Sequence, residues 1–334
     1  MNPHSCPDVR ATGFDPGPLL VAIPYLMGFH PQDSLVAVMI GDDQRVVLTL
    51  RLDWAAATTH PSATVAAIQQ RCAAVDPAAV VLVAAGCAGD PTDPLGQLAA
   101  SFAASGESPR LLWAGHATAT SWMGLSCAAA GCADHPLPTV AASEPALQLI
   151  VAGAAPLPGR ADVLAEVQPG PDGASIRVPA GSGDREVWRD ECLLRLQQLV
   201  TAEHPPADAE LAELMAGCAD IRVRDTWLRR MTVSARQQQW SRVWRCAAEA
   251  LRRGPESHIA AVGAVAGLAA WQLGDGLRAA AAVDRALATD PHHGLSQLLR
   301  RALDAGMPPS VWQEIMANLS EEQCRYGTRP ENAA

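Results

Sequence analysis

The chain has 334 residues, which is enough for two domains of ordinary size. Its net charge of −10 means that phosphate backbones and anionic membrane surfaces repel the molecule as a whole. Each of its 25 basic residues is Arg, and the abundance of Ala, Arg, Gly and Pro indicates a high-GC bacterial genome.

Cysteine usage and the amino terminus predict a cytoplasmic protein. The nine Cys are scattered through apolar surroundings and form no compact secreted framework, so we expect reduced thiols. Residues 1–10 have neither a basic start nor an apolar run, so we expect no signal peptide. The most apolar stretch, 259–273, is shorter than the roughly 20 residues of a membrane span. We therefore expect a buried helix there and no membrane partner.

The first 167 residues alternate between strand-like and helix-like patterns. Residues 19–29 are apolar and end in a tight turn at Gly28, and the patterns of 34–40 and 46–52 predict a hairpin across a polar turn. Further along come a helix over 64–74, a strand over 80–85, a helix over 94–105 and strands over 111–114 and 121–126. This order predicts an α/β domain over 1–167, with a mixed sheet of about five strands and covering helices.

The remainder of the chain is predicted to be helical. Residues 168–184 are rich in Pro and Gly and are the best candidate for a linker. Trp188, Cys192, Leu196 and Leu199 then fall on one helical stripe, which predicts a buried face. We expect an all-helical bundle over 185–325 and a disordered tail over 326–334.

One helical pair in this bundle resembles a tetratricopeptide repeat. Gly274-Asp275, Ala279, Ala286 and Asp290-Pro291 match its second helix, and Gly267 falls where the first helix carries a small residue. Only one unit is visible, whereas a solenoid needs about three. We therefore expect a repeat-like hairpin inside a bundle, with an ordinary Ala-rich helical hairpin as the alternative.

The first candidate site is a polar group at the start of the predicted hairpin, formed by His30, Asp33, Ser34, Arg51 and Asp53. Positions 51 and 53 point to one face of their strand. An Arg with a His can bind an anion or move a proton. The structural alternative, which we favour, is that Asp33 or Ser34 closes the turn and that the Arg pairs with an Asp.

The second candidate is a Cys and His cluster. Cys127, Cys132 and His135 have a C-x₄-C spacing at the loose end of zinc sites, with no second ligand pair, so they are weak metal candidates. A nucleophilic Cys127 would need a nearby His, such as His116 or His135. Two semi-buried thiols without a site are the favoured interpretation, and no cofactor is expected.

The third candidate is a local basic stretch from residue 220 to residue 253. The stretch contains nine Arg and three acidic residues, with Trp227, Trp240 and Trp244 between them. Arg interspersed with aromatic residues can bind nucleic acid. Trp240 and Trp244 also fall on an apolar helical stripe, with Arg242 and Arg245 expected on the opposite face. We favour core tryptophans and an outer face of solvated or domain-docking arginines, which makes a nucleic-acid partner unlikely.

The wider pattern resembles the domain of unknown function 4192 family, which consists of uncharacterised proteins mostly from high-GC Gram-positive bacteria. The resemblance rests on VAIPYLMGFHPQDSLV at 21–36, LRLD at 50–53, the segment 122–127 with Cys132, and the run from Trp244 to Pro309. Members often carry a paired Cys-Cys, whereas Cys132 stands alone here. The resemblance implies a fold and a genome type, and the family offers no activity to carry over.

Two functional hypotheses follow. The first is a non-catalytic ligand-binding or protein-binding adaptor, whose helical half would offer a groove between residues 259 and 305 to a protein partner. The alternative is an enzyme that acts on a small anionic metabolite at the sheet edge around His30, Asp33 and Arg51. We favour the first, because no sequence signature of a catalytic site is present.

Overall fold

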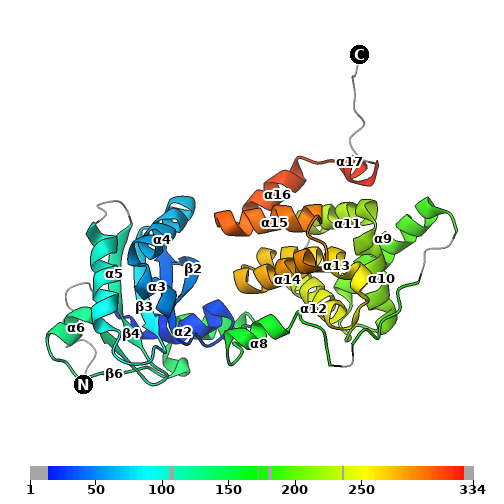
Figure 1. The fold of residues 1–334 in the computed structure, drawn as a ribbon. Coiled ribbons are helices and arrows are strands. Elements are labelled where there is room, and N and C mark those ends of the chain that lie inside the picture. Colours follow the sequence, from blue (N-terminus) through cyan, green and yellow to red (C-terminus); the bar gives the residue numbers. More distant parts are fainter. Residues whose placement is uncertain (1–13, 105–108, 172, 180–182, 235–236, 327–334) are drawn as a thin grey trace, which may run out of the picture. The chain divides into compact units, whose positions relative to one another are not determined.

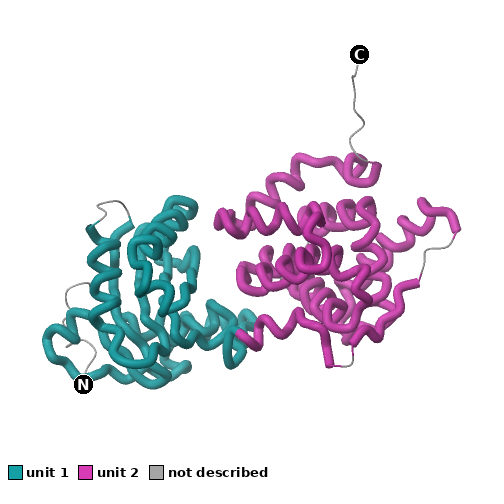
Figure 2. Tube along the Cα trace, in the orientation of Figure 1, with its two compact units in different colours: residues 1–160 teal, residues 161–334 magenta. Residues whose placement is uncertain are grey.

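The computed structural model describes residues 14–104, 109–171, 173–179, 183–234 and 237–326 (Figure 1). The chain divides into two compact units, residues 1–160 and 161–334 (Figure 2). All but the first residue of the tail expected at 326–334 lies outside the described residues, and Tyr326 ends the last helix. In the described residues, no helix combines the length and apolar character that a bilayer crossing requires.

Unit 1 is built on a mixed sheet of six strands in the order β2-β1-β3-β4-β5-β6. The strands are β1 (Ser34–Ile40), β2 (Val46–Asp53), β3 (Ala79–Ala85), β4 (Arg110–Ala117), β5 (Ser121–Gly124) and β6 (His135–Pro136). The pair β3–β4 is parallel, and the other neighbours are antiparallel. The hairpin and mixed sheet were predicted. The sixth strand was not, because two residues carry no recognisable alternation.

Helices cover both faces of this sheet. One face packs against α3 (Trp54–Thr59), α4 (Pro61–Val75) and α5 (Thr92–Ala104) through side chains such as Leu35, Leu82 and Leu98. The other face packs against α2 (Gly17–Met27) through side chains such as Ile23, Val36 and Val83. Strand β3 is buried along its whole length, which explains its continuous apolar sequence. The unit also contains α6 (Leu125–Ala129), the short 3₁₀ helix η2 (Val140–Ala142) and α7 (Glu144–Val151), which packs beside α2.

Four connecting segments meet at one edge of the sheet. Because β1 is antiparallel to both β2 and β3, its first residue lies beside the last residues of those strands, with Ser34 opposite Asp53 and Ala85. The end of β4 lies at the same edge, since β3 and β4 are parallel. The segments that precede β1 and that follow β2, β3 and β4 are therefore neighbours. Ligand sites in α/β sheets gather at such carboxyl ends of strands.

In its described residues, every regular element of unit 2 is a helix, as predicted. Its helices are α8 (Arg160–Ala165), which begins at the unit boundary, α9 (Arg185–Thr201), α10 (Asp208–Ala219), α11 (Ile221–Ser234), α12 (Gln237–Arg253), α13 (Glu256–Gln272), α14 (Gly276–Thr289), α15 (Gly294–Ala305), α16 (Ser310–Ala317) and α17 (Glu321–Tyr326). Helix α13 is central, because every residue from 262 to 271 is buried. It contacts α10, α12, α14 and α15.

The predicted repeat-like hairpin is formed by α13 and α14. These helices approach closely at two glycines of α13. A Cβ on Gly267 would lie 2.6 Å from Val283 Cγ2, and one on Gly263 would lie 2.8 Å from Ala286 Cβ. The small residue expected at position 267 is thus required by the helix contact.

The stretch expected to be a linker, 168–184, belongs to unit 2. Ile176, like the preceding Val167, is buried in the helical core. The amides of Ser175 and Ile176 donate to the carbonyl of Arg253 at 2.8 and 3.0 Å, and the amide of Gly170 donates to the carbonyl of Arg252 at 2.8 Å. Pro and Gly set an irregular backbone in the first part of this stretch, but its apolar residues still pack against the end of α12.

Candidate functional site

Asp33, one of the residues predicted at the sheet edge, holds the surrounding loops together. Its φ of 44° lies in the left-handed region, which Asp tolerates better than most residues. Its amide donates to the Gly86 carbonyl at 3.3 Å, and its carbonyl accepts from the Trp54 amide at 2.9 Å. Its Oδ1 accepts from the Ala88 amide at 3.2 Å. Asp33 therefore connects the loops that precede β1, follow β2 and follow β3.

Ser34, Arg51 and Asp53 form a second set of bonds on the adjoining strands. The buried Ser34 Oγ donates to the Gln32 carbonyl at 2.6 Å and accepts from Arg51 Nε at 2.9 Å. Arg51 Nη2 lies 3.6 Å from Asp53 Oδ2, and Asp53 Oδ1 accepts the Ala56 amide at 3.3 Å as the cap of α3. Burial, with a further contribution from Arg160, lowers the pKa of Arg51. These side chains meet on the expected strand face, and each has partners within the fold.

His30 lies apart from that group, at the mouth of a pocket. Its ring is exposed, and the residues that line this pocket do not include Asp33, Ser34, Arg51 or Asp53. The geometry thus separates the predicted group into a bonded cluster and one pocket residue.

The pocket lies between α2 and the carboxyl ends of β3 and β4, and its volume is about 240 Å³. Leu20 and Ile23 of α2 form one wall, Val83 and Ala117 contribute from the strands, and Leu137 comes from the segment after β6. Helix α2 is apolar almost throughout, so Leu20 and Ile23 pack toward the sheet. Pro24 lies inside this helix, and Gly28 ends it with a φ of 75°. Segments far apart in the sequence therefore build one cavity.

The lining of this pocket carries no charged side chain: Asp, Glu and Arg do not occur among its residues. Its polar side chains are those of Tyr25, His30, Gln32 and Thr118. Thr118 Oγ1 is bonded to Ser121, whereas the described residues offer no hydrogen-bond partner to the side chains of Tyr25, His30 and Gln32. The pocket thus combines an apolar interior with polar groups that are free to bond a ligand.

Gly86 brings two of the pocket's segments into close contact. Its φ of 58° favours glycine, and a Cβ at this position would lie 2.4 Å from Gln32 Oε1 and 3.1 Å from the Pro31 carbonyl oxygen. Only a residue without a side chain lets the Gln32 amide lie this close to the end of β3. Sequence reasoning missed Gln32, although Gln32 stands between His30 and Asp33.

The Cys and His cluster is built differently from the prediction. The buried His135 ring stacks on Trp122 with centroids 4.5 Å apart, and its Nε2 lies 3.5 Å from Cys127 Sγ. Cys127, however, is disulfide-bonded, so the expectation of a reduced thiol is wrong at this position, and Cys127 can serve neither as a thiolate ligand nor as a nucleophile. The spacing could not show this, because a disulfide depends on which chain segments meet in space. No group of three or more metal-ligating side chains occurs in the described residues.

A family model for a domain of unknown function, DUF4192, matches residues 16–310. The chain belongs to this family. The resemblance seen in the opening segment and in the carboxyl-terminal run is thereby confirmed. Neither a curated protein nor a solved structure matches the chain.

In this DUF4192 chain the arginines of residues 220–253 serve mainly the fold of unit 2. Trp240 and Trp244 are buried, as predicted. Arg242 was expected to face away from the core, but only 4% of it is exposed, because its Nε reaches the Leu199 carbonyl near the end of α9 at 3.2 Å. Other arginines bond within the unit: Arg224 to Asp225, Arg229 to the Leu319 carbonyl, Arg230 to Glu321, Arg252 to the Ala165 carbonyl, and Arg253 to Asp208 and Glu249.

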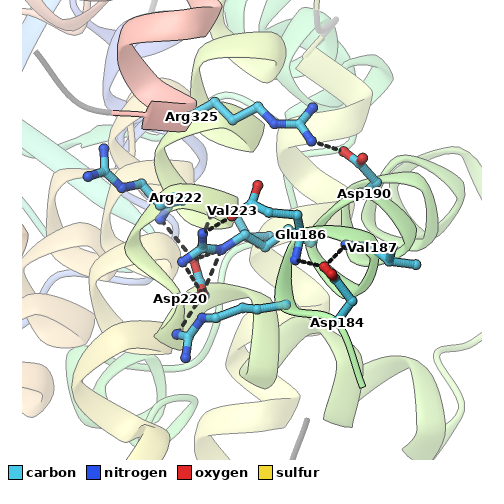
Figure 3. Close-up of polar contacts among 10 residues, drawn as sticks. Asp184, Glu186, Val187, Asp190, Asp220, Arg222, Val223 and Arg325 are labelled. Atoms are coloured by element: carbon cyan, nitrogen blue, oxygen red, sulfur yellow. Dashed lines mark hydrogen bonds and ion pairs between the residues drawn. The ribbon is translucent and has the colours of Figure 1, made fainter. Parts of the chain in front are cut away.

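Asp220 is a buried carboxylate at the centre of an ionic network at the start of α11 (Figure 3). Its carboxylate accepts from Arg185 at 2.9 Å, from Arg189 at 3.1 Å and from the amides of Arg222 and Val223 at 3.0 and 3.2 Å. Burial opposes ionisation, but the bonds from Arg185, Val223 and Arg189 outweigh it and keep the pKa of Asp220 below its ordinary value. The Asp220 carboxylate therefore caps α11 and links it to the arginines of α9.

The groove expected between residues 259 and 305 is not formed by α13. Its residues from 262 to 271 are all buried in the core of unit 2, so they cannot line a surface for a partner. Exposed apolar side chains occur instead at Leu298 of α15, within this region, and at Ile315 of α16, beyond it.

Proposed function

We propose that this protein binds a small uncharged molecule in the pocket beneath α2 and does so without catalysing a reaction. The observation that carries the proposal is the charge-free, largely apolar lining, together with the side chains of Tyr25, His30 and Gln32, which have no hydrogen-bond partner among the described residues. Ligand pockets typically join an apolar body to a few placed polar groups, and this one lies at the strand ends where α/β sheets bind ligands.

The lining selects against charged molecules. A carboxylate or an ammonium group that enters the pocket loses hydration and meets no opposite charge in compensation. Its volume of about 240 Å³ also limits the size of the ligand. A cavity of about 150 Å³ holds benzene, so this pocket suits a molecule of roughly ten non-hydrogen atoms.

The alternative, an enzyme that acts on an anionic metabolite, has less support. Asp33, Ser34 and Arg51 are bonded into the fold and lie outside the pocket lining. The thiol nearest to this group, Cys87, has its pKa raised by burial to about 11, so it is protonated at neutral pH. A binding role requires neither a nucleophile nor a base.

Isopropylbenzene is a suitable first probe, because it is uncharged and close to the pocket in size. We expect it to raise the thermal unfolding midpoint of the wild-type protein and to give a measurable Kd by calorimetry. Ala117→Leu places a larger side chain in the pocket and is expected to weaken this binding at least tenfold. Ala56→Leu, on the exposed surface of α3, is the control and should bind as the wild type does.

A folded Ala117→Leu variant that still binds isopropylbenzene with the wild-type Kd would contradict the proposal. Should this variant fail to fold, Val21→Phe tests the same pocket from α2, where Val21 is only partly buried. Folding of each variant is checked by circular dichroism before binding is measured.

Three wider statements stay predictions. The cytoplasmic location and the high-GC bacterial source rest on composition and resemblance. A protein-binding role for unit 2 rests on its repeat-like hairpin and on the exposed apolar residues of α15 and α16.

A further inference from the structure

We infer that the ligand of the pocket beneath α2 carries an uncharged amide group, with a carbonyl and an N–H side by side, attached to an apolar ring. This inference rests on the proposed function and specifies its ligand class. It follows from the position and the bonding capacity of Gln32.

Gln32 is held at the pocket by its neighbours. Its backbone carbonyl accepts the Ser34 hydroxyl at 2.6 Å, and its side-chain Oε1 lies against Gly86, where a Cβ would come within 2.4 Å. Asp33, the next residue, is fixed by bonds to Gly86 and Ala88. The Gln32 backbone is therefore anchored, while its terminal amide lies beside Gly86 at the pocket, without a partner among the described residues.

The bonding capacity of this edge matches an amide. The Gln32 side chain offers a carbonyl acceptor beside N–H donors, and a second amide can satisfy both at once. A ligand with acceptors alone bonds only the Gln32 N–H groups and leaves its oxygen to water, and one with donors alone bonds only the oxygen. His30 and Tyr25 each provide one more group that can donate or accept, so a second polar atom on the ligand can also be bonded.

The apolar walls determine the rest of the molecule. Leu20, Ile23 and Val83 surround the interior, and Pro24 and Pro138 add flat ring surfaces. A compact apolar ring fills such a space, while the amide stays at the edge where Gln32 is exposed to solvent. A carboxylate of the same shape would bring a charge that no lining residue balances.

Three probes with the same number of non-hydrogen atoms separate the effects of the ring, the amide and a negative charge on binding. Benzamide has the ring and the amide, benzoate has the ring and a negative charge, and isopropylbenzene has the ring alone. We expect the full-length protein to bind benzamide about fivefold tighter than isopropylbenzene and at least tenfold tighter than benzoate. Kd values are measured by calorimetry for each probe.

Gln32→Met keeps the length of the side chain and removes its donor and acceptor. It is expected to weaken benzamide binding about fivefold and to leave the Kd of isopropylbenzene unchanged. Gln70→Met is the matched control, because Gln70 is exposed on α4 and lies outside the pocket. It should bind both probes as the wild type does.

Different results would overturn the amide ligand and the pocket as a binding site. If Gln32→Met binds benzamide with the wild-type Kd while isopropylbenzene still enters the pocket, the amide inference is overturned and the proposed function stands. If the wild type prefers benzoate to benzamide, the inference is also overturned. If neither benzamide nor isopropylbenzene binds, the proposed function itself fails.

Discussion

At the scale of single residues, hydrogen bonds decide which polar side chains remain available to a ligand. Asp33, Ser34, Arg51 and Asp53 use their polar atoms to join the strands and loops at the sheet edge. The side chain of His30, only three residues before Asp33, borders the pocket without a partner among the described residues. Two neighbours in one short segment thus differ, since Asp33 is bonded into the fold and His30 borders the proposed ligand site.

Asp220 allows a sharp test of a buried charge. Asp220→Ala leaves Arg185 and Arg189 without their carboxylate and removes the cap of α11, so we expect a loss of about 3–5 kcal/mol in the free energy of unfolding. Asp190→Ala is the control, because Asp190 pairs with Arg325 at the surface, where an ion pair is worth about 0–1 kcal/mol. Urea unfolding measures both, and equal losses would contradict the account.

The same carboxylate predicts a pH dependence. Its pKa in the folded protein is below its ordinary value, so the unfolded chain binds the proton more readily as the pH falls. Its stabilising contribution is complete above the unfolded pKa of about 3.9 and is lost as the pH falls through the lower folded value. The stability difference between wild type and Asp220→Ala should therefore shrink in acid.

At the scale of elements, the α13–α14 contact depends on residues without side chains. Gly263→Ala places a Cβ 2.8 Å from Ala286 Cβ and 2.9 Å from the Ala282 carbonyl oxygen, so the helices must move apart. We expect a loss of about 1–3 kcal/mol of stability. Gly276→Ala, at the start of α14 with no atom nearby, is the control and should be neutral or slightly stabilising. Unchanged stability in Gly263→Ala would show that the contact is looser than described.

Some elements of the fold could be predicted from the sequence and others could not. The hairpin, the buried strand β3 and the glycine at 267 were predictable, because alternation, apolar runs and small residues are local signals. Strand pairing also placed Arg51 opposite Val36 and Asp53 opposite Ser34, on one face as expected. The pocket was not predictable. It is formed by α2, two strand ends and the segment around Leu137, which are far apart in the sequence, and local patterns do not predict such long-range contacts.

At the scale of the whole molecule, the chain consists of two units, each with its own core. The position of the boundary has a measurable consequence. A fragment of residues 161–334 retains Val167 and Ile176 in the helical core and keeps the bond between Arg278 Nε and Glu166 Oε2 at 2.6 Å. A fragment of 185–334 loses all three.

We expect the longer fragment to be the more stable by about 3 kcal/mol or more, since burying one aliphatic side chain contributes about 1.5–3 kcal/mol. Urea unfolding followed by circular dichroism compares the two fragments. Equal stabilities would indicate that residues 168–184 act as a linker, as their Pro and Gly content predicts, and would contradict their packing in the structure.

The claim that the cavity beneath α2 is a binding site is tested most directly by methyl NMR of the full-length protein during titration with isopropylbenzene. We predict saturable shifts for the methyl groups of Leu20, Ile23, Val83 and Leu137, while those of Leu196 and Leu214 in the core of unit 2 stay constant. Shifts confined to unit 2, or no saturable shift in the four pocket residues, would contradict the account.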